Sequence, residues 1–166
     1  MKKFNLKKIA KEVLLFALLL FIFSNILSFL RAPDTASKLP DFSAVTLEGE
    51  KFNSLDQNKP ILIHFWATWC PTCKLENSAI DSLSKRFNVI TIVENSGNDA
   101  KVKAFLKEKN LSFKVINDQD GTFASMFNVN GFPTSFIYDK TGELRFSEVG
   151  YSSYVTTYLK LLYVGG

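Results

Sequence analysis

The amino-acid sequence predicts an α/β fold in which a mixed central sheet is flanked by helices. A nearly continuous apolar run at 61–67 has the length of a buried strand, and a helical pattern at 73–87 and an apolar strand at 89–93 follow it. Strand, helix and strand at these lengths indicate a right-handed parallel crossover. Later, two strands within 134–149 flank the turn Asp-Lys-Thr-Gly at 139–142, which predicts an antiparallel hairpin. Parallel strands followed by a hairpin make the sheet mixed.

The helix at 73–87 is predicted from apolar residues at helical spacing, namely Leu75, Ala79, Ile80, Leu83 and Phe87. A second helix is expected at 98–109, because Asn98 or Asp99 can cap its first turn. The remaining elements follow from shorter patterns: a hairpin around 48–50, a strand at 113–116, a short helix at 122–127 and a closing helix at 151–163.

The N-terminal 31 residues predict a cytoplasmic basic tip and one transmembrane helix. Residues 13–30 carry no charge and are about long enough to span a bilayer. Five lysines precede them, so the positive-inside rule keeps the N-terminus in the cytoplasm. A cleaved signal peptide is the alternative, but residues 28–31 offer no pair of small residues for cleavage. We therefore expect a single-pass anchor in the lipid of a bacterial inner membrane, with a tether at 32–40 and a domain at 41–166 on the periplasmic or extracytoplasmic side.

The charge distribution supports a membrane interpretation of the basic residues. Residues 1–31 have a net charge of +5, whereas the rest of the chain has 14 basic and 15 acidic residues, a net charge of −1. Because the excess positive charge flanks the apolar run, we expect no nucleic-acid partner.

The chain has only two cysteines, Cys70 and Cys73, so it cannot form a separate structural disulfide. They lie where the apolar strand gives way to a helix. The N–H groups and the positive dipole at a helix N-terminus stabilise a thiolate, which makes Cys70, placed in the first turn, the expected nucleophile. Cys73 lies one turn deeper on the same face and is the expected resolving thiol. In an exported domain such a pair indicates thiol–disulfide chemistry.

Two other interpretations of the cysteines are weaker. A structural zinc site needs two further cysteine or histidine ligands, and His64 is the only histidine, so we expect no metal. Two inert core cysteines would fit poorly with Trp69 and Pro71, which mark a turn at the start of the helix.

The sequence FWATWCPTCKLE, together with Gly-Phe-Pro-Thr at 131–134, resembles the thioredoxin superfamily, in particular its membrane-anchored TlpA/ResA/CcmG group. The resemblance implies a thioredoxin-like fold and a thiol–disulfide oxidoreductase whose only redox group is its own disulfide, without a cofactor. It also implies that Pro133 is cis and that Phe132 and Pro133 form a platform for the partner protein. The alternative is an ordinary turn proline.

Within this group the segments at 31–33, 96–100, 115–118 and 150–154 resemble those of the ScsD type, which is associated with copper tolerance. Members that act in cytochrome c maturation usually carry an acidic residue after the platform proline, where this chain has Thr134. Near the dithiol we place Trp69, Pro71 and Thr72 as further substrate contacts, with Trp66 framing the site.

His64 precedes Cys70 by six residues, the position at which cytoplasmic thioredoxins have a buried acid. It is therefore a candidate catalytic residue, acting as a base or as an electrostatic stabiliser of the thiolate. The alternative is a neutral core imidazole, which burial favours. Glu76 is a weaker candidate for the same role.

The expected function is disulfide exchange with partner proteins, in the direction of reduction, with a transmembrane thiol-electron transporter as the electron source. The alternatives are a disulfide donor and a Cu(I)-binding protein, since a dithiolate is a soft ligand. A peroxidase, which needs a peroxidatic cysteine in its own pocket, and a purely structural protein are less consistent with the intact Cys70, Cys73 and Pro133.

Overall fold

The computed structural model describes residues 37–166 and, in the N-terminal part, residues 11–12, 14–16 and 19, which are helical. Residues 1–32 and 33–166 form separate units. The predicted anchor at 1–31 therefore lies almost wholly outside the described residues. Among the residues that are described, no helix is both long and apolar enough to cross a membrane.

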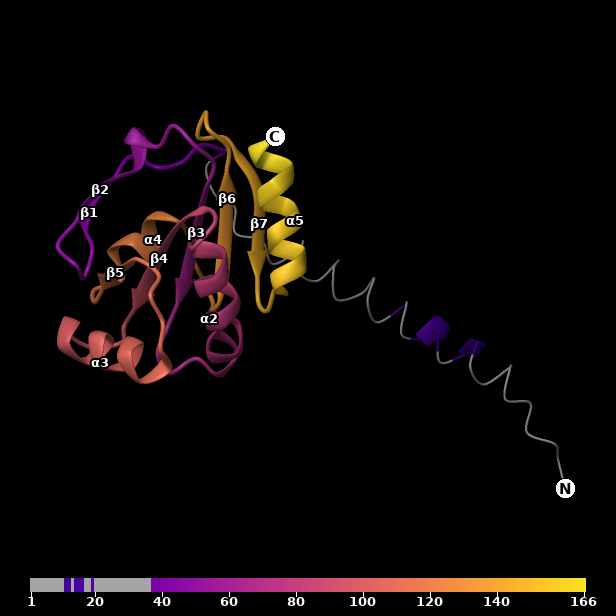
Figure 1. Ribbon diagram of the computed structural model, residues 1–166, viewed down its shortest axis with the longest axis horizontal. Helices are drawn as coiled ribbons and strands as arrows, with labels where there is room; N and C mark the ends of the chain where they lie inside the picture. The colour runs from indigo at the N-terminus through magenta and orange to yellow at the C-terminus, as the bar shows by residue number, and fades with distance from the viewer. Residues whose placement is uncertain (1–10, 13, 17–18, 20–36) are drawn as a thin grey trace, which may run out of the picture. The chain divides into compact units, whose positions relative to one another are not determined.

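The second unit contains a five-stranded sheet with the order β5-β4-β3-β6-β7, helices α2 to α5, and a separate two-stranded hairpin (Figure 1). The hairpin strands are β1 (Ser43–Val45) and β2 (Lys51–Asn53), followed by the short 3₁₀ helix η1 (Ser54–Asp56). The sheet strands are β3 (Ile61–Trp66), β4 (Asn88–Glu94), β5 (Val115–Asp118), β6 (Thr134–Tyr138) and β7 (Leu144–Val149). The helices are α2 (Pro71–Ser84), α3 (Asp99–Lys109), α4 (Thr122–Met126) and α5 (Tyr154–Gly165).

Strand pairing confirms the predicted mixed sheet. β3 pairs in parallel with β4 and β4 with β5, whereas β6 is antiparallel to both β3 and β7. β3 is buried along its whole length, as a central strand covered on both faces must be. The expected crossover and the C-terminal hairpin are therefore both present.

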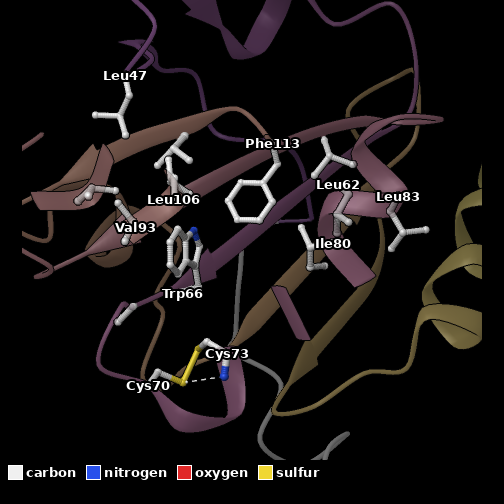
Figure 2. Close-up of a cluster of buried hydrophobic side chains, with 14 of the residues drawn as sticks. Leu47, Leu62, Trp66, Cys70, Cys73, Ile80, Leu83, Val93, Leu106 and Phe113 are labelled. Carbon is white, nitrogen blue, oxygen red and sulfur yellow. Dashed lines mark hydrogen bonds between the residues drawn. A yellow bond between two sulfur atoms is a disulfide. The ribbon is translucent and has the colours of Figure 1, made fainter. Parts of the chain in front are cut away.

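The two faces of the sheet have different cores. On one face, which we call the dithiol face, residues of α2, α3 and α5 pack with Leu62, Trp66 and both cysteines, and Figure 2 shows the disulfide at the edge of this cluster. On the other, which we call the aromatic face, α4 and the β1–β2 hairpin pack on Ile63 and Phe65. Successive side chains of β3 alternate between the two faces, as strand geometry requires.

Some predicted elements are shifted or wrong in detail. β5 begins at Val115, two residues later than expected, although Phe113 is buried in the core. α5 begins at Tyr154, because Ser153 caps its first turn by accepting a hydrogen bond from the N–H of Thr156. Leu75 is 74 % exposed and does not belong to the apolar face of α2. At about 100° per residue, Leu75 lies roughly 200° around the helix from the buried Cys73.

Residues 37–40, placed in the tether by the sequence, contact the turn between β6 and β7. Leu39 is buried, and its N–H donates to the carbonyl of Gly142 at 2.8 Å. The N–H of Leu144 donates to the carbonyl of Ser37, also at 2.8 Å. Residues 37–40 therefore belong to the same compact unit as the sheet and lie beside this turn.

Candidate active site

Cys70 and Cys73 form a disulfide at the N-terminus of α2, with their Cα atoms 5.3 Å apart. Cys70 is the N-cap residue rather than part of the first turn, because its backbone is extended and Pro71 begins the helix. A proline suits this first helical position, since its missing N–H would have no partner in the helix. The Cys70 Sγ accepts a hydrogen bond from the N–H of Cys73 at 3.1 Å (Figure 2). In the reduced protein the same N–H and the helix dipole would stabilise a thiolate at Cys70.

The two sulfur atoms differ in access. The side chain of Cys70 lies at the surface end of the cluster with 4 % of its residue area exposed, whereas Cys73 is completely buried. A partner protein can therefore approach Cys70 but not Cys73, which agrees with the predicted roles of nucleophile and resolving thiol.

The loop after β4 supports the segment that precedes the cysteines. The indole Nε1 of Trp69 donates to the carbonyl of Asn95 at 3.1 Å, and the N–H of Thr68 donates to the Ser96 hydroxyl at 2.9 Å. Trp69 is 56 % exposed and stands edge-on to the ring of Phe132, with ring centroids 5.8 Å apart. It is therefore a rigid aromatic surface beside the disulfide.

Trp66 has a different role from the one expected. It is completely buried and packs against Phe105 and Phe113, with ring centroids 5.6 Å apart in both pairs. It supports the cysteines from within the dithiol face and does not line the surface of the site.

The platform residues are held by hydrogen bonds at both ends. The Phe132–Pro133 peptide bond is cis, as the resemblance implied. The N–H of Gly150 donates to the Pro133 carbonyl at 2.8 Å, and the Thr134 hydroxyl donates to the Gly131 carbonyl at 2.7 Å. These bonds tie the platform to the start of β6 and the end of β7.

A surface groove of about 490 Å³ runs beside the disulfide. It brings together Cys70 and four of the predicted substrate contacts, which are Trp69, Pro71, Thr72 and Phe132. Pro133 is buried and does not line the groove. The other lining residues are Glu94, Val129, Asn130 and Gly131.

Glu94 is a groove residue that the sequence did not indicate. It ends β4, and burial together with the nearby Asp118 carboxylate raises its pKa. In the sequence, Glu94 could have been identified only as a charged residue directly after an apolar strand. Ligands commonly bind at the carboxyl ends of such strands.

His64 lies inside the dithiol face and not in the groove. It is completely buried, its Nδ1 is 2.9 Å from the Ser135 hydroxyl oxygen, and its Nε2 has no hydrogen-bond partner. Burial lowers the pKa of His64 to about 3, so the imidazole is neutral at neutral pH. It therefore supplies no positive charge to a thiolate there, and so low a pKa also makes the imidazole a weak base, so a catalytic role for His64 stays a prediction.

Glu76 is more prominent than the sequence indicated. It lies three residues after Cys73, on the same side of α2, and only 1 % of its area is exposed. Burial and the nearby Glu148 carboxylate raise the pKa of Glu76 to about 8, although a hydrogen bond from the backbone of Ser152 lowers it. Its Oε2 has no hydrogen-bond partner. A carboxyl group that exchanges its proton near neutral pH thus lies next to the resolving thiol, and its helical spacing from Cys73 was the available signal.

Comparison with known proteins gives a consistent result. The Redoxin family matches residues 34–162. The chain is 35 % identical over 153 residues to a thioredoxin-like protein of Haemophilus influenzae, covering 90 % of this chain and 91 % of that protein. It is 30 % identical over 116 residues to the thiol-disulfide oxidoreductase ResA of Bacillus thuringiensis, covering 67 % of each chain.

Among solved structures, a thiol:disulfide interchange protein of the thioredoxin family from Chlorobium tepidum superposes with a TM-score of 0.70 at 27 % identity. The match covers 78 % of this chain and 97 % of that one.

Proposed function

Because the chain belongs to the Redoxin family and is a protein thiol–disulfide oxidoreductase, we propose that it is tethered to the bacterial inner membrane and reduces disulfides of partner proteins outside the cytoplasm. The redox group is its own cysteine pair, and no external cofactor is required. The single observation that carries the exchange activity is the placement of Cys70 at the N-terminus of α2, at the edge of a groove, with Cys73 completely buried. The tether is proposed from the uncharged apolar run at 13–30.

The geometry supports a two-step exchange. In the reduced protein, the Cys70 thiolate attacks one sulfur of a partner disulfide, forms a mixed disulfide and releases the other partner sulfur as a thiolate. Cys73 then loses its proton and attacks the Cys70 sulfur, which releases the second partner sulfur. Two electrons pass to the partner, and the protein is left with the Cys70–Cys73 disulfide seen in the structure.

The proton of Cys73 needs an acceptor, because its thiol is buried away from water. Glu76 is suited to this task, since its carboxyl group lies one turn along α2 and its pKa is raised to about 8.

The reducing direction rests on the proposed tether. Tethering raises the effective concentration of the domain near a membrane electron source, which we propose to be a transmembrane thiol-electron transporter. The groove beside Cys70 is the proposed contact surface for the partner in either direction. A disulfide donor uses the same residues in reverse, and the ScsD-type association with copper tolerance remains a proposal about physiology.

The direction is tested by the reduction potential of the Cys70–Cys73 pair in the full chain, equilibrated in glutathione buffers and followed by thiol alkylation. A value below about −230 mV supports a reductase, whereas a value above about −170 mV contradicts that direction and favours a disulfide donor.

The topology is tested with alkaline phosphatase fused after Gly166, since this enzyme is active only when exported. We expect an active fusion that stays in the membrane fraction with residues 1–31 uncleaved. An inactive fusion would contradict export, and an active soluble fusion that lacks its N-terminus would indicate a cleaved signal peptide.

A further inference from the structure

The exposed side of α5 is apolar, which is unusual for a helix at a protein surface. Val155, Leu159, Leu162 and Tyr163 are 62 %, 58 %, 48 % and 69 % exposed. At about 100° per residue, these positions fall within an arc of about 100° on one side of the helix. No charged residue lies within this arc, although the outer side of a surface helix is normally polar. We call these four residues the α5 stripe.

The stripe extends from the end of the molecule that carries the dithiol to the opposite end. α5 runs antiparallel to β7, because Lys160 pairs with Glu148 and the ring of Tyr163 contacts that of Phe146 with centroids 6.2 Å apart. Figure 1 shows the helix lying alongside β7. Its first turn follows Ser152, whose backbone bonds Glu76 in the active-site helix.

The far end of the stripe lies close to the point where the preceding chain joins the domain. Ser37 is hydrogen-bonded to Leu144 at the start of β7, two residues before the Phe146 that contacts Tyr163. Ser37 is six Cα-to-Cα steps from Arg31, the end of the predicted anchor, so covalent geometry limits that distance to about 22 Å. If the chain is anchored at residues 13–30, the point at which it enters the domain is covalently limited to this distance from the anchor.

Basic side chains flank the same end. Lys59 and Arg86 line an apolar hollow of about 450 Å³ together with Leu161 and Leu162. An apolar helix face bordered by lysine or arginine is the arrangement that binds an anionic lipid surface. In a twofold contact that packs two copies of α5 in parallel, the same basic residues would lie close to each other and repel.

We propose that the α5 stripe lies on the surface of the membrane to which the chain is tethered, with its apolar side chains among the lipid head groups and Lys59 and Arg86 over anionic phosphates. This inference rests on the proposed tethering. Lying lengthwise, α5 holds the dithiol end of the domain close to the bilayer, within reach of a membrane-embedded electron donor.

The test compares two exposed leucines in the full chain. Leu159→Cys lies in the stripe, and Leu55→Cys, in η1, is the matched control, because leucine at that position is 63 % exposed. With the Cys70–Cys73 disulfide intact, the new cysteine is the only thiol, and it is labelled with the fluorophore NBD. The labelled proteins are reconstituted into vesicles of phosphatidylethanolamine and phosphatidylglycerol, with and without brominated acyl chains, which quench NBD on contact.

We expect quenching at position 159 to be at least threefold stronger than at position 55. Equal quenching at both positions, or none at 159, overturns the proposal. A blue shift at 159 that shows no quenching by brominated lipid and disappears on dilution identifies a second copy as the occupant, and this also overturns it.

Disulfide exchange is measured on the same samples. Retained exchange without quenching contradicts only the lipid contact, whereas quenching without exchange supports the lipid contact and contradicts the proposed function.

Discussion

Both faces of the central sheet carry a buried core, but the two cores serve different purposes. The aromatic face is built from rings such as Phe65, Phe127 and Phe136, whose centroids lie 5.2 to 5.9 Å apart. The dithiol face holds the two cysteines and also the polar side chains of His64 and Glu76. Burial on the aromatic face stabilises the fold, whereas burial on the dithiol face changes proton affinities as well.

The polar groups of the dithiol face form a row across the sheet. His64 of β3 is in register with Ser135 of β6, which is in register with Glu148 of β7, and paired residues on adjacent strands share a face. Glu148 in turn pairs with Lys160 and raises the pKa of Glu76. The chemistry of the cysteine pair is therefore connected to residues far from it in the sequence.

The largest expected effect is on disulfide exchange, and it should differ between variants of the two cysteines. Cys70→Ser should reduce disulfide exchange with insulin to the uncatalysed rate, because the accessible nucleophile is lost. Cys73→Ser should instead accumulate mixed disulfides with the partner, since nothing remains to resolve them. Non-reducing gels after alkylation distinguish the two variants, and accumulation of mixed disulfides by Cys70→Ser would contradict the assignment.

On the aromatic face, Phe127→Ala should lower the free energy of unfolding by about 3–5 kcal/mol, the usual cost of deleting a buried ring. The exchange rate per folded molecule should not change, because Phe127 packs on the face away from the cysteines. Urea unfolding of the oxidised protein measures the loss. A loss of stability below about 1 kcal/mol, or a large change in exchange rate, would contradict the division between the faces.

On the dithiol face, Glu76 should make stability depend on pH. Because the pKa of Glu76 is raised to about 8, the folded state keeps a proton that the unfolded chain releases near pH 4.5. The stability that this bound proton provides is fully present below about pH 4.5 and is lost as the pH rises toward 8. The loss in the free energy of unfolding is at most about 1.4 kcal/mol per pH unit. Between pH 6.5 and 8 the oxidised wild type should lose about 2 kcal/mol, and Glu76→Gln should not. An equal loss in both proteins would exclude Glu76 as its source.

The free energy of unfolding of the wild type should change least with pH between about pH 5 and 6.5. In that range the contributions of His64 and Glu76 to stability change in opposite directions. The pKa of His64 is lowered to about 3, so its contribution is lost as pH falls below 6.5, the range in which the unfolded chain binds a proton. The wild type should change little there, whereas Glu76→Gln should lose about 2 kcal/mol on acidification from pH 6.5 to 5. Adding His64→Asn should remove that loss, and a loss that persists in the double variant would exclude His64.

Much of the fold was predictable from local patterns. The buried strand β3, the helix after the cysteines and the C-terminal hairpin were predicted because apolar periodicity and turn residues act over short distances. The error at Leu75 arose because only apolar residues were assigned to the buried face of α2, whereas the structure buries the polar Glu76 and Asn77 on that face and leaves Leu75 exposed.

The sequence by itself determined the reactive pair, since Cys70 and Cys73 are the only cysteines and the helix that begins between them follows from local signals. Only the tertiary structure decided that Cys73 and Glu76 are inaccessible, that Trp66 is core while Trp69 borders the groove, and that Glu94 faces the partner side. These properties depend on which distant strands and helices cover a side chain. Desolvation and long-range charges then set its proton affinity, and neither is encoded in the neighbouring residues.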